Sequence, residues 1–159
     1  MQIQIIAVGK LKENYLKDGV NDYLKRLKSY THLTITEVND EKEPANDNPS
    51  EIRLIKAKEG ERIAKQLKKD TYLIALAIEG KTFSSEQLAD HLAQLALNGK
   101  SHLTFVIGGS FGLDESITQR ADLLLSFSKM TFPHQLMRLI LTEQIYRSYR
   151  IINHHSYHK

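Results

Sequence analysis

The chain contains no cysteine among its 159 residues, which excludes disulfide bonds, thiolate zinc sites and a cysteine nucleophile. This absence is typical of a reducing compartment, so we expect a cytoplasmic protein. No apolar run approaches the roughly 20 residues that a membrane-spanning helix needs, and the opening residues 1–10 are typical of a strand rather than a signal peptide. We therefore expect no association with a membrane.

Internal repeats, low-complexity tracts and linker-like segments are also missing. A length of 159 residues suits one domain and is sufficient for a hydrophobic core. Hydrophobic residues make up 41% of the chain, an ordinary share for a globular protein, so we expect a single domain spanning residues 1–159. The acidic stretch 39–51 contains two prolines and is expected to be a mobile surface loop.

Acidic residues are scarce toward the C-terminus. From Lys129 to the end, five basic residues accompany one acidic residue, a balance of +4 in a chain whose net charge is +3. A basic segment of this kind could be a footprint for nucleic-acid phosphates. A solvated helix face is the alternative, and charge alone does not decide between the two.

Five apolar segments predict strands, and helical patterns lie between them. Several segments are apolar throughout, which is typical of strands covered on both faces in a parallel sheet. One helix is expected to begin at Asn48 and Pro49, and another has a possible capping box at Ser84 and Gln87. The alternation predicts an α/β fold with a mostly parallel sheet and helices on both faces. The predicted strands are residues 2–8, 33–38, 71–78, 102–107 and 122–127.

A glycine-rich loop, Gly108–Gly112 (GGSFG), directly follows the fourth predicted strand. Glycine lets the backbone approach a ligand closely, and ligands of open α/β sheets bind outside the carboxyl ends of strands. The loop has neither the Gly-Lys-Ser/Thr of a Walker loop nor the G-x-G-x-x-G spacing of a dinucleotide site. A tight turn without a ligand is the alternative interpretation.

A second loop leads from the fifth predicted strand into an apolar helix. Within residues 126–135, Pro133 suits a first helical turn and Thr131 is a possible cap. Backbone amides at a helix N-terminus could hold a carboxylate or another polar edge of a ligand. The helix that follows is apolar around most of its circumference, which indicates burial on more than one side. A second subunit could supply the additional cover.

The C-terminal residues 153–159 contain three histidines. They leave three interpretations open: a metal site, a disordered polar tail and an active-site tail. In an active-site tail, Tyr157 would contact a base and His158 would take or give a proton. Farther upstream, Arg147 has the helical spacing for an ion pair with Glu143, and this interpretation competes with a catalytic role for Arg147.

These segments resemble the bacterial family of ribosomal large-subunit pseudouridine N3-methyltransferases, which are minimal SPOUT enzymes. The resemblance covers essentially the whole chain, and its most specific part is residues 125–135 (LSFSKMTFPHQ). It extends to residues 6–12 (IAVGKLK), residues 105–110 (FVIGGS) and the terminal Tyr157-His158. A Gly-Gly-Ser loop alone would be weak evidence for this family, but its combination with the other motifs is specific.

The resemblance implies a C-terminal trefoil knot, a homodimer and S-adenosylmethionine as methyl donor, without a metal. The implied substrate is 23S ribosomal RNA within the ribosome, methylated at N3 of a pseudouridine. The implied donor-binding residues are Leu76, Gly108, Phe127, Ser128, Lys129, Met130, Thr131 and Phe132.

We expect Arg147, Tyr157 and His158 to be the catalytic residues of this reaction. Arg147 would stabilise an oxygen of the base as negative charge grows, and His158 would accept the N3 proton. Tyr157 would stack on the base, an interaction worth roughly 1–3 kcal/mol. In a dimer, the tail of one subunit could complete the site of the other.

Two other functions remain compatible with the residues. A non-catalytic nucleotide- or metabolite-binding module would keep the glycine loop without needing the catalytic trio, and a ribosome-associated factor would bind without methylating. The modest charge predicts weak binding to isolated RNA. Some exposed basic side chains could contact phosphates or could simply be solvated helix residues, namely Lys10, Lys12, Lys25, Arg26 and Lys28.

Overall fold

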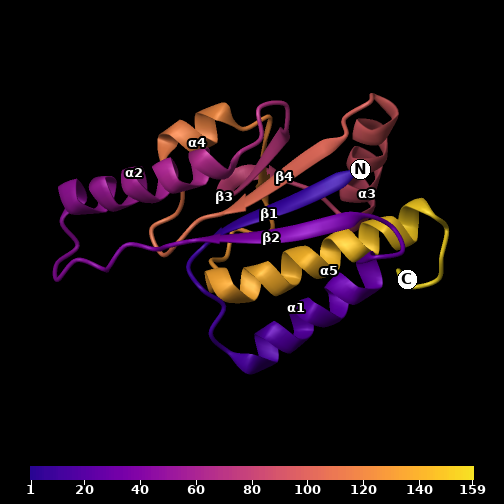
Figure 1. Cartoon of the computed structure of the whole chain (residues 1–159), viewed down its shortest axis with the longest axis horizontal. Coiled ribbons are helices and arrows are strands. Elements are labelled where there is room, and N and C mark those ends of the chain that lie inside the picture. Colours follow the sequence, from indigo (N-terminus) through magenta and orange to yellow (C-terminus); the bar gives the residue numbers. More distant parts are fainter.

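The computed structural model describes residues 1–159 and contains one five-stranded sheet with helices on both faces (Figure 1). All neighbouring strands pair in parallel, in the order β2-β1-β4-β3-β5. The predicted α/β class is therefore confirmed. The elements are β1 (Gln2–Val8), α1 (Asn14–Leu27), β2 (His32–Val38), α2 (Pro49–Gln66), β3 (Tyr72–Thr82), α3 (Ser85–Leu97), β4 (His102–Ile107), α4 (Glu115–Arg120), β5 (Leu123–Ser126) and α5 (His134–Ile152).

Local signals set the starts of α2 and α3 as predicted. Asn48 accepts a hydrogen bond from the Ser50 amide at the start of α2, and Ser84 forms the capping box with Gln87 at the start of α3. Because α2 begins at Pro49, the loop expected over 39–51 ends three residues earlier, at Asn48. The prediction that Thr131 caps α5 was wrong.

Helix α5 instead starts two residues later than that cap would require. Pro133 stands at its N-cap position with an extended backbone, and no side chain caps the helix. Proline can occupy this place because an N-terminal position needs no amide donor for the helix ladder. The first turn therefore leaves its amides free of side-chain caps.

Alternation of side chains along β1 explains its continuous apolar run over residues 5–8. Ile3 and Ile5 belong to the core between the sheet and α1, α3 and α5, whereas Ile6 and Val8 belong to the core on the side of α2 and α4. Successive side chains of a strand point to opposite faces, so a strand covered twice needs apolar residues at every position.

Helix α5 crosses the sheet between α1 and α3, with Met137, Leu141 and Ile145 buried in the larger core. No residue of the helix is fully exposed. The sheet and the two flanking helices thus supply the cover that the apolar circumference of α5 demands. A second subunit is not needed to explain this pattern.

The pairing of β3 with β5 is irregular at the point where β3 passes the cavity described below. Leu125 of β5 stands opposite both Leu76 and Lys81, so the intervening residues of β3 bulge out of the ladder. Gly80 lies in this bulge, and a Cβ there would come within 2.7 Å of the Leu124 carbonyl. Only glycine allows the two backbones to approach this closely.

We expect Gly80→Ala to destabilise the protein by about 1–3 kcal/mol, since the added methyl group meets backbone atoms that cannot rotate away. Gly19→Ala is the matched control: its Cβ would meet the Leu139 side chain, which can move, and alanine gains up to about 1 kcal/mol of helix propensity. Urea unfolding of both variants measures the difference. Equal unfolding midpoints would contradict the steric argument.

Candidate functional site

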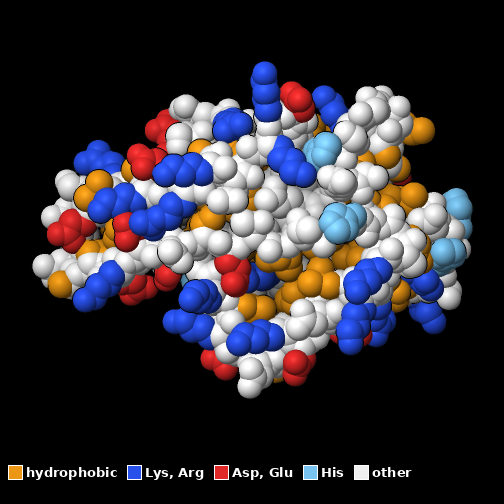
Figure 2. All heavy atoms as spheres, in the orientation of Figure 1, with side chains coloured by type: hydrophobic (Ala, Val, Ile, Leu, Met, Phe, Trp, Pro, Cys, Tyr) orange, Lys and Arg blue, Asp and Glu red, His pale blue; other side chains and the backbone are white.

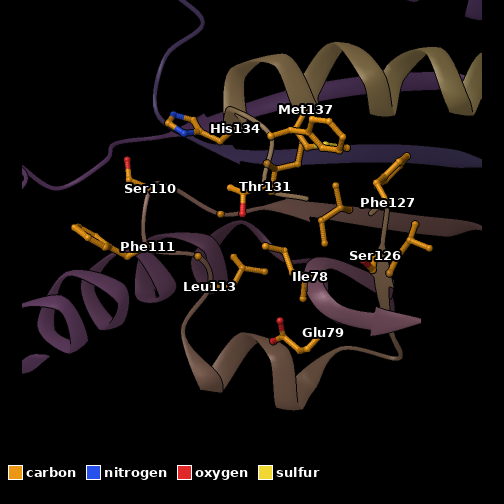
Figure 3. Close-up of a pocket in the computed structure, with 18 of the residues that line it drawn as sticks. Ile78, Glu79, Ser110, Phe111, Leu113, Ser126, Phe127, Thr131, His134 and Met137 are labelled. Atoms are coloured by element: carbon orange, nitrogen blue, oxygen red, sulfur yellow. The ribbon is translucent and has the colours of Figure 1, made fainter. Parts of the chain in front are cut away.

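A cavity of about 720 Å³ opens at the carboxyl edge of the sheet (Figure 3). Its walls come from the bulged half of β3, the glycine loop after β4, the loop between β5 and α5, and the first turn of α5. This volume lies within the range of roughly 300–1,000 Å³ that small-molecule sites occupy. The cavity is therefore large enough for a ligand of nucleoside size.

The predicted donor-binding residues gather around this cavity from three separate chain segments, because parallel strands deliver their carboxyl ends to one edge of the sheet. Lys129 is the exception: it is exposed and does not line the cavity, so its role stays a prediction. The residues that do line the cavity are Leu76, Gly108, Phe127, Ser128, Met130, Thr131 and Phe132.

The glycine loop is a tight turn and a cavity wall at once. A Cβ on Gly108 would lie 2.8 Å from the backbone carbon of Gly112, so the loop folds back on itself without space for a side chain. Gly112 has φ +84° and donates its amide to the Gly109 carbonyl at 3.0 Å. The turn brings bare backbone to the cavity, where a ligand can approach it closely.

The loop between β5 and α5 keeps several backbone donors free. Ser126 donates to the Ser128 carbonyl at 3.1 Å, and the Ser128 hydroxyl accepts from the Met130 amide at 3.0 Å. The amides of Lys129, Thr131 and their neighbours Ser128 and Phe132 donate no hydrogen bond within the chain. Unpaired amides beside a cavity can bind the polar edges of a ligand.

Further lining residues were not among the predicted ones. Glu79 is the only carboxylate of the cavity wall, and His134 of α5 lies at the opposite side (Figure 3). Burial, followed by the charge of Arg138, lowers the pKa of His134 and favours its neutral form. Both residues follow predicted segments closely, since Glu79 is three positions beyond Leu76 and His134 belongs to the 125–135 motif.

The C-terminal tail turns sharply at the end of α5. The His155 amide donates to the Arg150 carbonyl at 2.9 Å, and the His154 amide donates to the Ile151 carbonyl at 3.1 Å. With His154 at φ +56°, this is a Schellman turn in which histidine occupies the position usually held by glycine. The turn directs the last residues back along α5.

Tyr30, which follows α1, fastens the returning tail. Its hydroxyl lies 2.5 Å from Nδ1 of His155 and accepts a hydrogen bond from Arg150 at 2.9 Å. Arg150 also donates to the Ser156 carbonyl at 2.7 Å, and the Tyr30 ring stacks on Tyr149. The tail is thereby held against α1 and α5.

The three predicted catalytic residues lie together at the end of this tail. The guanidinium of Arg147 stands 4.7 Å from the ring centre of Tyr157 and donates to Nδ1 of His158 at 3.1 Å. Glu143 accepts from Arg147 at 2.7 Å, which confirms the predicted ion pair, and from the Tyr157 hydroxyl at 2.9 Å. His158 Nε2 lies 2.7 Å from Glu86 of α3.

This network defines the charge of its members. The hydrogen bond to Glu143 raises the pKa of Arg147, and burial together with Tyr23 and Glu143 raises the pKa of Tyr157. The hydrogen bond from His158 lowers the pKa of Glu86. At neutral pH the site therefore presents a cationic arginine, a protonated tyrosine and a histidine whose two ring nitrogens are both engaged.

Within one chain, the trio and the cavity lie at opposite ends of α5 (Figure 1). His134 lines the cavity, and Arg147 lies thirteen positions further on, a helix length of roughly 20 Å at 1.5 Å per residue. Each predicted set of residues is brought together, but the two sets are kept apart.

Two further properties concern metals and membranes. No group of three or more histidine, cysteine, aspartate or glutamate side chains is arranged to hold a metal ion. None of the helices combines the length and hydropathy that crossing a bilayer requires.

We expect His154→Gly to stabilise the protein by up to about 1 kcal/mol, because glycine adopts positive φ without the steric cost that a side chain incurs. Asn153→Gly is the control one position earlier, where φ is −91°, and it should lose stability. Urea unfolding of both variants distinguishes the two positions. A loss of stability in His154→Gly would show that the imidazole itself matters.

Comparison with known proteins places these features in context. A family model described as "Predicted SPOUT methyltransferase" matches residues 1–158. The chain is 58% identical over 159 residues to "Ribosomal RNA large subunit methyltransferase H" of Bifidobacterium adolescentis, and 55% identical to the protein of that name from Bacillus pumilus. Each alignment covers the full length of both chains.

Proposed function

The chain belongs to the SPOUT methyltransferase family, and we propose that it transfers a methyl group to N3 of a pseudouridine in 23S ribosomal RNA. Members of this family are knotted α/β enzymes that use S-adenosylmethionine. The observation that carries the proposal is the single cavity formed by three separate segments of the predicted donor site. A non-catalytic binding module is not favoured, because both full-length relatives are named as methyltransferases.

The cavity wall suits the methyl donor. The unpaired amides of the 127–132 loop would bind polar edges of the nucleoside, and the bare backbone at Gly108 would allow close approach. Apolar side chains such as Leu76 and Phe127 would contact the adenine ring. When bound, the donor supplies an electrophilic methyl group on a sulfonium. The wall must therefore orient the donor toward the acceptor and exclude water.

The acceptor nitrogen carries a proton that must leave before or during attack. We assign this proton to His158, whose Nδ1 would accept it after releasing the hydrogen bond from Arg147, while Nε2 keeps its hydrogen bond to Glu86. Arg147 would then stabilise the negative charge that develops on an oxygen of the base. The Tyr157 ring, with a pKa raised by burial, would remain neutral and stack on the base.

A homodimer would bring the two halves of this site together. The trio lies too far from the cavity of its own chain for a methyl transfer, which needs reacting atoms about 3–3.5 Å apart. In a twofold dimer with antiparallel α5 helices, the tail of each subunit would reach the cavity of its partner. The folded-back tail, fastened by Tyr30, would present Tyr157 and His158 as one unit.

The same proposal covers the setting of the reaction. Because the net charge is only +3, this domain is expected to bind isolated RNA weakly and to depend on the assembled ribosome for a preorganised surface. The absence of cysteine and the ribosomal substrate both favour the cytoplasm as the location.

Methylation of ribosomes with labelled donor, followed by nucleoside analysis of the 23S RNA, tests the proposal. We expect His158→Ala to bind the donor with unchanged affinity in calorimetry but to lose roughly 10²–10⁴-fold in kcat, the usual range for a proton-transfer residue. Gly108→Ala should lose donor binding, because its Cβ would meet the backbone of Gly112. Wild-type turnover in His158→Ala would remove this residue as the base.

Mixing the two inactive variants tests whether the site is shared between subunits. A dimer of one Gly108→Ala chain and one His158→Ala chain contains one site with an intact cavity and an intact tail. After exchange of subunits, random pairing should restore roughly a quarter of the wild-type activity. A mixture that stays inactive despite exchange would show that cavity and tail act within one chain.

A further inference from the structure

The loop from β1 into α1, residues 9–13, lies beside the mouth of the cavity. A Cβ on Gly9 would be 3.8 Å from Nε2 of His134, which lines the cavity. The Lys12 amide donates to the side chain of Gln135 at 3.1 Å. The loop therefore lies against the first turn of α5, whose N-terminus adds a partial positive charge.

A buried arginine fastens this loop. Arg138 is 2% exposed and donates to the Gly9 carbonyl at 3.1 Å while forming an ion pair with Glu37. Glu37 in turn accepts from the Leu11 amide at 2.9 Å. Burial alone would raise the pKa of Glu37, but the hydrogen bonds from Arg138 and Leu11 outweigh it and lower this pKa. The loop is thus held at two backbone positions by an ion pair between the buried Arg138 and the exposed Glu37.

The loop presents two basic side chains, Lys10 and Lys12, and one acidic side chain, Glu13. Lys10 and Lys12 are exposed, and neither forms an ion pair. Acidic groups near the loop are Glu13, Asp40 and the already paired Glu37. Figure 2 shows lysine and arginine side chains gathered over the segment that leads from β1 into α1. A buried arginine whose ion pair holds an exposed loop with two unpaired lysines indicates a function for that loop.

We infer that residues 9–13 form a phosphate-binding contact for the RNA substrate, with Arg138 as its positioning residue. The inference rests on the proposed function, since the base to be methylated must enter the cavity beside this loop. Phosphates flanking that base then pass near Lys10 and Lys12. Phosphate contacts of this kind set the register of a nucleic acid without reading its sequence.

The double variant Lys10→Ala/Lys12→Ala tests the contact against the control Lys69→Ala/Lys100→Ala. The control removes two exposed lysines from the loops before β3 and β4, at the opposite edge of the sheet, so both variants lose the same charge. We expect the first double variant to raise the KM for ribosomes about tenfold with kcat and donor affinity unchanged. The slope of log KM against the logarithm of the salt concentration should decrease by roughly 1.5, the contribution expected of two phosphate contacts.

Identical KM values and salt slopes in the two double variants would overturn the inference, as would a change in donor affinity caused by Lys10→Ala/Lys12→Ala. Co-sedimentation with ribosomes gives the same comparison without methyl transfer. A wild-type protein that binds ribosomes through these lysines but never methylates them would contradict the proposed function and leave the phosphate contact standing.

Arg138→Lys tests the positioning role, because lysine keeps the charge beside Glu37 but lacks the fork that also reaches Gly9. It should raise the ribosome KM while donor affinity persists, and adding it to Lys10→Ala/Lys12→Ala should give little further increase. Fully additive increases in KM would mean that Arg138 has only a structural role.

If Arg138→Lys fails to fold, Gln135→Ala provides a second test, because it removes only the acceptor of the Lys12 amide. It should raise the KM for ribosomes without altering the unfolding midpoint. An unchanged KM would refute the positioning of the loop by α5.

Discussion

The burial of α5 against the sheet is the constraint on which both candidate sites depend. Leu141 and Ile145 are completely buried between α1, α3 and the strands, so the helix cannot shift without opening the larger core. Its first turn forms part of the cavity wall, and its last turns carry Arg147 and the fastened tail. One rigid helix thereby sets the distance between the cavity and the cluster of Arg147, Tyr157 and His158 within one chain.

The cavity itself results from the parallel sheet. Neighbouring strands β3, β4 and β5 run in one direction, so the segments that follow or interrupt them meet at one edge. Glycine is needed where backbone meets backbone, at Gly80 against β5 and at Gly108 against Gly112. Close backbone packing leaves amides rather than side chains to face a ligand, which suits recognition of a nucleoside by its polar edges.

Polar networks organise the segments that lack regular structure. Arg138 holds the loop after β1 through Gly9 and Glu37, whereas Tyr30 and Arg150 hold the C-terminal tail. Arg138 thereby contacts the backbone of a segment distant in sequence, and Tyr30 contacts the side chain of the distant His155. Such hydrogen bonds cost little conformational entropy where helices already order the donors. They keep exposed basic groups in defined positions.

Local patterns in the sequence determined the strands, the starts of α2 and α3 and the α/β class, since strand burial and capping depend on residues a few positions apart. The motifs and their resemblance to a family pointed to the residues of the cavity, because backbone loops at strand ends leave a recognisable signature. Tertiary structure alone decided that α1 and α3 cover α5, that Glu79 and His134 join the wall, and that the tail lies at the far end of α5. These outcomes depend on contacts between residues far apart in the chain, and a periodic pattern carries no information about which distant partner a side chain meets.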